Sequence, residues 1–245
     1  MKRPLTEEEI LQPDYPKPTV FAILFAVIAL IEIIGVAFNL FFLQLSAKPL
    51  IIPVLMIYLM YSYTRVHGKH LLFAGLFFSF VGDVLLLFQQ DVPSFFIFGL
   101  IAFLITHIFY IIFFVRIKSS QRSLYRSQPW WLLLIYSYSF GLFILIYPGL
   151  GKMEYPVAAY ATVISLMVMC SIHVFTKVNS PANKMYVWGA SLFVLSDSLL
   201  AIAKFAYPFP LSGVLIMLTY CAAQFLIVQG FIAHKPEIKQ EDFFF

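Results

Sequence analysis

The chain contains 245 residues, of which 62% are hydrophobic and only 11% are charged. An ordinary soluble domain is about 45–50% apolar and about 25% charged. This composition, together with a mean hydropathy of +0.90, excludes a mainly soluble protein and predicts an all-α fold, a polytopic membrane bundle. The net charge of +4 does not indicate a nucleic-acid partner, because the basic residues lie between the apolar runs, where membrane topology accounts for them.

Eight apolar runs approach the roughly 20 residues that a membrane-spanning helix needs. We predict transmembrane helices at 19–39, 49–64, 71–89, 94–115, 130–147, 155–175, 185–204 and 211–233. The second is short and contains Pro53, while the short connections favour a compact bundle of adjacent antiparallel helices. The expected organisation is a cytoplasmic tail at 1–18, an eight-helix transmembrane domain at 19–233 and a second cytoplasmic tail at 234–245.

The lysines and arginines are distributed unevenly over the two sides of this bundle. Thirteen of the 16 fall on the side that holds both termini, and the other three are Lys48, Lys152 and Lys204. Because positively charged loops stay in the cytoplasm, both termini are predicted to be cytoplasmic. We expect an integral protein of the bacterial inner (plasma) membrane.

Three acidic residues interrupt the apolar runs: Glu32 in the first predicted span, Asp83 in the third and Asp197 in the seventh. The two aspartates lie in similar short sequences, VGDVLL at 81–86 and LSDSLL at 195–200. A carboxylate in hydrocarbon is costly and by default marks a site that faces the protein interior. Both aspartates lie about a dozen residues into outward-running spans, which gives them similar depth. We therefore expect both carboxyls to face one internal cavity, whereas Glu32 could equally serve a structural pairing.

Further polar residues lie within the predicted spans that run inward. His107 is near the midplane with Tyr110 one turn further on, and Tyr220 and Gln224 are one turn apart in the last span. These side chains could orient the carboxylates or a water, or could simply join helices by hydrogen bonds. A catalytic zinc site needs about three protein ligands, and His107 is the only histidine deep within a predicted span. We therefore expect no metal and no other cofactor. The remaining histidines are expected to be solvated: His67, His70, His173 and His234.

Five short motifs follow one another along the chain. They are Lys48-Pro49-Leu50, Gly82-Asp83-x-x-Leu86, His107-x-x-Tyr110, Gly189-Ala190-x-x-Phe193-x-x-Ser196-Asp197-x-x-Leu200-Ala201 and Tyr220-x-x-x-Gln224-x-Leu226-Ile227. Their order and spacing resemble the YhhN-like family of lysoplasmalogenases, integral membrane proteins with eight helices. The resemblance covers roughly residues 19–233.

The resemblance implies hydrolysis of the vinyl ether bond of a lysoplasmalogen, a 1-alkenyl-lysophospholipid, to a fatty aldehyde and a glycerophospho-base. That reaction needs a carboxylic acid to protonate the alkene and a carboxylate to stabilise the resulting cation, a division of labour that glycosidases also use. Asp83 and Asp197 are the expected pair, with Glu32 and the polar residues above in supporting roles. Lys48, at the outer rim, could contact the lipid phosphate or snorkel to the interface. The expected partners are the lysophospholipid and membrane lipid, and the oligomeric state is left open.

Two other classes of protein also use carboxylates inside a membrane. A proton-coupled transporter could use Glu32, Asp83 and Asp197 as a relay, and a four-helix offset between the aspartates would suit parallel repeats. An intramembrane aspartyl protease also needs two aspartates, but the residues before Asp83 are not its usual Gly-x-Gly. A purely structural scaffold does not explain three buried acids.

Overall fold

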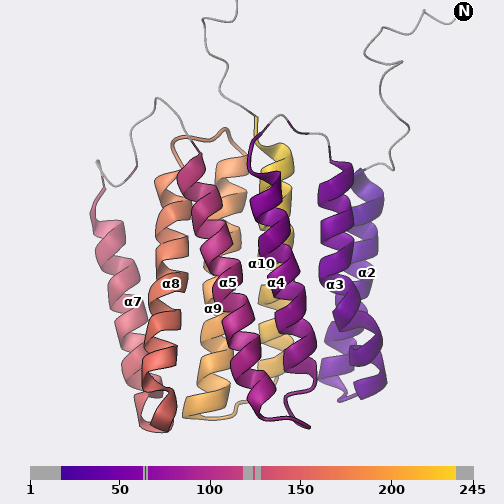
Figure 1. Ribbon diagram of the computed structural model, residues 1–245, viewed down its shortest axis with the longest axis vertical. Helices are drawn as coiled ribbons and strands as arrows, with labels where there is room; N and C mark the ends of the chain where they lie inside the picture. The colour runs from indigo at the N-terminus through magenta and orange to yellow at the C-terminus, as the bar shows by residue number, and fades with distance from the viewer. Residues whose placement is uncertain (1–17, 63, 65, 118–123, 125–127, 236–245) are drawn as a thin grey trace, which may run out of the picture.

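The computed structural model describes residues 18–62, 64, 66–117, 124 and 128–235. Within these residues, eight helices are long and apolar enough to cross a membrane, which confirms the predicted fold class. Figure 1 shows them side by side as a bundle. They are α2 (Pro18–Ala37), α3 (Phe41–Tyr61), α4 (Lys69–Leu87), α5 (Ser94–Arg116), α7 (Trp130–Ile146), α8 (Glu154–His173), α9 (Ala182–Ala201) and α10 (Ser212–Ala233).

The bundle is wider than it is deep, with α7 at one edge and the pair α2 and α3 at the other (Figure 1). The two most extensive helix–helix contacts join α4 to α5 and α9 to α10. These pairs are related by the same four-helix offset as the two aspartates, but the correspondence is incomplete, since α2 packs on α3 far more extensively than α7 packs on α8. Only Ile135 and Ile146 of α7 are buried, so α7 is the most peripheral helix.

Glycines allow the backbones of α4 and α5 to approach closely. A Cβ atom on Gly75 would lie 2.4 Å from the ring of Tyr110, and one on Gly82 would lie 2.7 Å from the ring of Phe103. The Thr106 hydroxyl donates across the same interface to the Gly75 carbonyl at 3.0 Å. Small residues have this role in membrane helices because close backbone approach increases van der Waals contact.

The second helix, α3, begins at Phe41, eight residues earlier than predicted, and contains both Pro49 and Pro53. Every backbone polar group in lipid needs a partner, so the apolar residues before Lys48 extend the helix, and the bundle tolerates the two prolines inside it. Lys48 therefore lies about two turns inside α3 rather than at its start, and its expected place at the outer rim stays a prediction.

The remaining boundaries agree with the predicted spans to within a few residues. Two short 3-10 turns, η1 (Tyr147–Gly149) and η2 (Gly151–Met153), connect α7 to α8. A π-helical segment, η3 (Ile202–Ala206), continues α9. Most of the two predicted tails lies outside the described residues.

His234, directly after α10, is buried rather than solvated as expected. It is 9% exposed, and its Nδ1 is 3.2 Å from the hydroxyl of Tyr186 on α9. This burial lowers the pKa of His234 to about 4. The prediction failed because the tight packing of α9 against α10 continues to the last turn of α10.

Candidate active site

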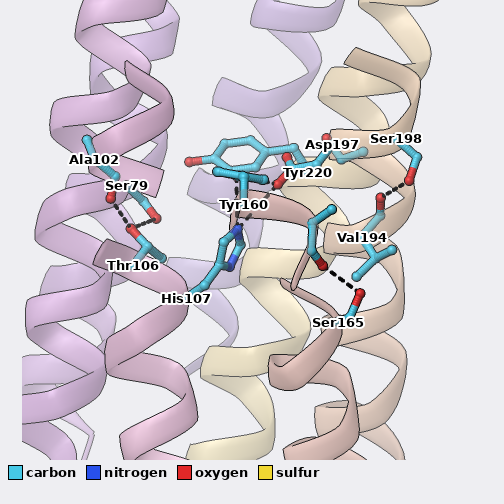
Figure 2. Close-up of polar contacts among 12 residues, drawn as sticks. Ser79, Ala102, Thr106, His107, Tyr160, Ser165, Val194, Asp197, Ser198 and Tyr220 are labelled. Carbon is cyan, nitrogen blue, oxygen red and sulfur yellow. Dashed lines mark hydrogen bonds and ion pairs between the residues drawn. The ribbon is translucent and has the colours of Figure 1, made fainter. Parts of the chain in front are cut away.

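Asp197 on α9 is the centre of a hydrogen-bonded group formed by three helices (Figure 2). The hydroxyl of Tyr160 on α8 donates to Asp197 Oδ2 at 2.5 Å. His107 Nε2 on α5 lies 3.3 Å from the same oxygen and 3.0 Å from the Tyr160 hydroxyl. Packing of α8 against both α5 and α9 brings these side chains together.

The two contacts define the proton positions in this group. Tyr160 gives its only proton to Asp197, so Nε2 of a neutral His107 faces two oxygen acceptors and carries the ring proton. The other ring nitrogen, Nδ1, is buried without a hydrogen-bond partner among the described residues. All hydrogen bonds to the Asp197 carboxyl end on Oδ2, and 15% of its side chain is exposed, which leaves Oδ1 for a reacting molecule.

A cavity of about 50 Å³ adjoins Asp197 and lies between α7, α8 and α9. Its lining includes the polar side chains of Asp197, Tyr160 and Ser198 and the apolar side chains of Leu142, Ile146 and Val157. A water needs only about 10–15 Å³ of such volume, so the cavity has room for several. It therefore provides space for both a water and a short apolar segment beside the carboxylate.

Asp83 on α4 belongs to a different network. It is 2% exposed, and the hydroxyl of Tyr220 on α10 donates to its Oδ2 at 2.6 Å. Gln224, one turn further along α10, donates to Ser79 at 2.8 Å and accepts from Tyr110 at 2.7 Å. This network ties α4, α5 and α10 together in the protein interior.

Two phenylalanine rings lie between the networks. Phe103 and Phe193 contact each other at 6.2 Å between ring centroids, and both contact the ring of Tyr220, at 5.8 and 5.5 Å. Phe193 also meets the ring of His107 edge-on at 4.6 Å. We call Phe103 and Phe193 the aromatic partition, because Tyr220 of one network and His107 of the other both pack against it.

The expected site residues are thus divided into two groups. The cavity beside Asp197 is not lined by Asp83, and the expectation that both carboxyls line one cavity is wrong for this cavity. The structure brings His107 to Asp197, whereas Tyr110, Tyr220 and Gln224 join the Asp83 network.

Glu32 and Lys48 lie on the Asp83 side of the molecule. Glu32 on α2 is fully buried, and neither carboxyl oxygen has a hydrogen-bond partner among the described residues. Lys48 interacts electrostatically with both Glu32 and Asp83, and these two acids also interact with each other. Lys48 thus offsets part of the negative charge of this region.

Tyr160 is a site residue that the sequence did not indicate. A tyrosine within an apolar helix is common enough that it does not stand out as a carboxylate does. One signal was present, since Tyr160 lies inside its span, away from the interfacial position where tyrosine is usually enriched.

The fold and these networks define an integral membrane protein with two carboxylate centres buried between its helices. The chain belongs to the YhhN family, whose family model matches residues 43–231, as its five motifs predicted. It is 30% identical over 175 residues to lysoplasmalogenase TMEM86A of Bos taurus and 31% identical over 182 residues to its Homo sapiens counterpart. Each alignment covers 69% of this chain and 68% of the relative.

A third relative, lysoplasmalogenase TMEM86B of Mus musculus, is 34% identical over 160 residues, or 64% of this chain and 62% of the relative. No solved structure matches the chain. The chain is therefore connected to proteins named lysoplasmalogenases by sequence alone.

Proposed function

We propose that this chain is a lysoplasmalogenase that cleaves the vinyl ether bond of a 1-alkenyl-lysophospholipid to a fatty aldehyde and a glycerophospho-base. Two observations support the proposal. The relatives carry that name, and Asp197, held by Tyr160 and His107, borders a cavity inside the membrane bundle. The assignment of Asp197 as the reacting group rests on the second observation.

In the first step, Asp197 acts as the general acid. The proton on Oδ1 moves to the alkene carbon remote from the ether oxygen, while a lone pair of that oxygen forms the new bond of an oxocarbenium ion. Tyr160 and His107 donate to Oδ2 and so stabilise the carboxylate that this step leaves behind. General acid catalysis of this kind contributes about 10²–10⁴-fold in rate.

In the second step, Asp197 acts as the general base. A water in the cavity adds to the oxocarbenium carbon, and its proton returns to Oδ1. The hemiacetal then collapses to the aldehyde and the glycerol hydroxyl of the headgroup fragment, so that one water is consumed and Asp197 is restored. The same residue serves both steps because the second requires the base that the first creates.

Asp83 is the second carboxylate of the proposed mechanism and acts through its field. In its ionised form Asp83, which accepts a hydrogen bond from Tyr220, lies behind the aromatic partition and favours the oxocarbenium ion over the neutral alkene. Apolar surroundings screen such an interaction far less than water does. Tyr110 and Gln224 position this network, while Lys48 and Glu32 set the charge around Asp83.

Release of aldehyde from a 1-alkenyl-lysophospholipid by the purified protein tests this function. Asp197→Asn should lower kcat at least 10²-fold, because an amide cannot deliver the proton. Asp83→Asn should also remove most activity, and His107→Ala should weaken turnover less severely. Thr162→Ala is a matched control, because Thr162 is exposed on the same helix as Tyr160 and its hydroxyl donates to the Ala158 carbonyl of that helix. Near-normal turnover by Asp197→Asn would refute the assignment.

The main alternative is a proton-coupled transporter. The observation that favours it is the buried carboxyl of Glu32, which has no hydrogen-bond partner among the described residues. The same preparation, reconstituted in liposomes with a pH-sensitive dye, distinguishes the two functions. Proton or solute movement without cleavage of any vinyl ether lipid would replace the hydrolase with the transporter.

A further inference from the structure

A shallow groove beside α7 is not used by the proposed reaction. Its volume is about 390 Å³, and it lies between α7 and the π-helical segment η3. The lining residues are Ser137, Tyr138, Gly141, Leu142, Leu145 and Ile202. The five residues from α7 recur at helical spacing and therefore form one face of that helix.

The groove adjoins the cavity that contains Asp197. Tyr138 and Leu142 line both hollows and so form the wall between them. The Tyr138 hydroxyl crosses this wall and donates to Ser198 at 2.8 Å, the residue that follows Asp197. The groove and the cavity beside Asp197 thus share these two side chains.

We propose that this groove binds the single hydrocarbon chain of a lysophospholipid and leads its reacting end past Tyr138 and Leu142 to Asp197. This inference deepens the proposed function, on which its kinetic test rests, by naming the place where the substrate chain lies.

The location and the lining of the groove support this occupant. The helix α7 lies within a span, Trp130–Gly149, that is apolar enough to cross the membrane, so the surroundings of the groove are lipid chains. Five of the six lining residues are Tyr138, Gly141, Leu142, Leu145 and Ile202, so the lining is mostly apolar and suits a hydrocarbon chain.

Gly141 provides a way to fill the groove without disturbing the fold. A Cβ atom at this position would meet no atom within 4 Å, so a larger side chain enters open space. Gly141→Phe should occupy the groove, and Gly141→Ala and Gly141→Leu form a graded series. Leu134→Phe is the matched control, because Leu134 is exposed on the same helix and lines neither hollow.

The kinetic test compares a hexadecenyl with a hexenyl lysophospholipid in mixed micelles. Gly141→Phe should raise KM for the long chain at least about tenfold more than for the short chain, because two or more methylenes lose their apolar contacts. The size of the effect should follow the order Ala, Leu, Phe, and Leu134→Phe should behave as wild type. An equal effect on both chain lengths would overturn the inference.

A binding test gives a result whether or not the protein is a hydrolase. A single-chain lysophospholipid with a diazirine at the chain end is photocrosslinked, and the labelled peptides are identified by mass spectrometry. The label should be found on the α7 and η3 peptides. The amount of label on them should be lower in Gly141→Phe than in wild type. Unlabelled lysophospholipid should displace the label, and diacyl lipid should not. This pattern without aldehyde release would refute the proposed function alone. Cleavage by wild type with label spread evenly over all exposed helices would refute the groove alone.

Discussion

At the scale of single residues, the two buried aspartates differ in what surrounds them. Asp197 accepts two hydrogen bonds on one oxygen and adjoins a cavity, whereas Asp83 accepts one from Tyr220 and is enclosed by packed side chains. The similar short sequences around the two aspartates indicated a symmetric pair. The structure places Asp197 beside a cavity and Asp83 in the packed interior, so the two are not equivalent.

Tyr160 offers a selective test of the Asp197 group. Tyr160→Phe removes one of the two donors to Oδ2, and a hydrogen bond to a charged group is worth about 1.5–3 kcal/mol. We expect kcat to fall about 10- to 100-fold with little change in KM, because the cavity keeps its shape. Tyr155→Phe, on the same helix but 85% exposed, is the control. Unchanged turnover in Tyr160→Phe would mean that Tyr160 has no part in the reaction.

His234 predicts a pH dependence of stability. Its pKa in the folded protein is about 4, below its ordinary value of 6.5, so the unfolded chain binds the proton more tightly. Stability should therefore fall as the pH is lowered from 6.5 to about 4. Thermal unfolding in detergent should show a shallower fall for His234→Asn, and exposed His67→Asn should keep the wild-type slope. Equal slopes in all three proteins would contradict the argument.

At the scale of helices, the sequence predicts depth better than rotation. The distance of Asp83 and Asp197 from their helix ends follows from residue number and a fixed rise, so their similar depth was predictable. The direction in which each side chain points depends on which neighbours pack on each face. No short motif carries that information, and the division of the expected site into two networks could not be predicted.

The interface between α4 and α5 should tolerate no added carbon at Gly75. Gly75→Ala places a Cβ atom 2.4 Å from the ring of Tyr110, which is fully buried and cannot move freely. Overpacking of this kind costs about 1–3 kcal/mol, so the midpoint of thermal unfolding should drop. Gly141→Ala is the matched control, since nothing lies near its new Cβ atom. A midpoint equal to wild type in Gly75→Ala would show that the helices separate easily.

At the scale of the whole molecule, hydropathy was enough to predict eight helices, but not every boundary. The predicted start of α3 at residue 49 is wrong, because the helix begins at Phe41 and contains both Pro49 and Pro53, which a membrane bundle tolerates. The orientation in the membrane remains a prediction from the distribution of Lys and Arg.

Two cysteine variants test that orientation. Lys152→Cys lies in the connection between α7 and α8, and Lys184→Cys lies near the start of α9, at the opposite end of the bundle; both positions are exposed. A membrane-impermeant maleimide added to intact cells should label Lys152→Cys only, because Lys184 is predicted to face the cytoplasm. The opposite pattern would invert the topology.

The network that joins Ser79, Tyr110, Tyr220 and Gln224 to Asp83 has a consequence for how such a chain is made. Apolar replacements at these positions would make each helix enter the bilayer more readily, because hydrocarbon favours them over amides and hydroxyls. The same replacements would remove the contacts that fix how α4, α5 and α10 are rotated against one another. Selection for efficient insertion and selection for correct assembly therefore act in opposite directions on these few side chains.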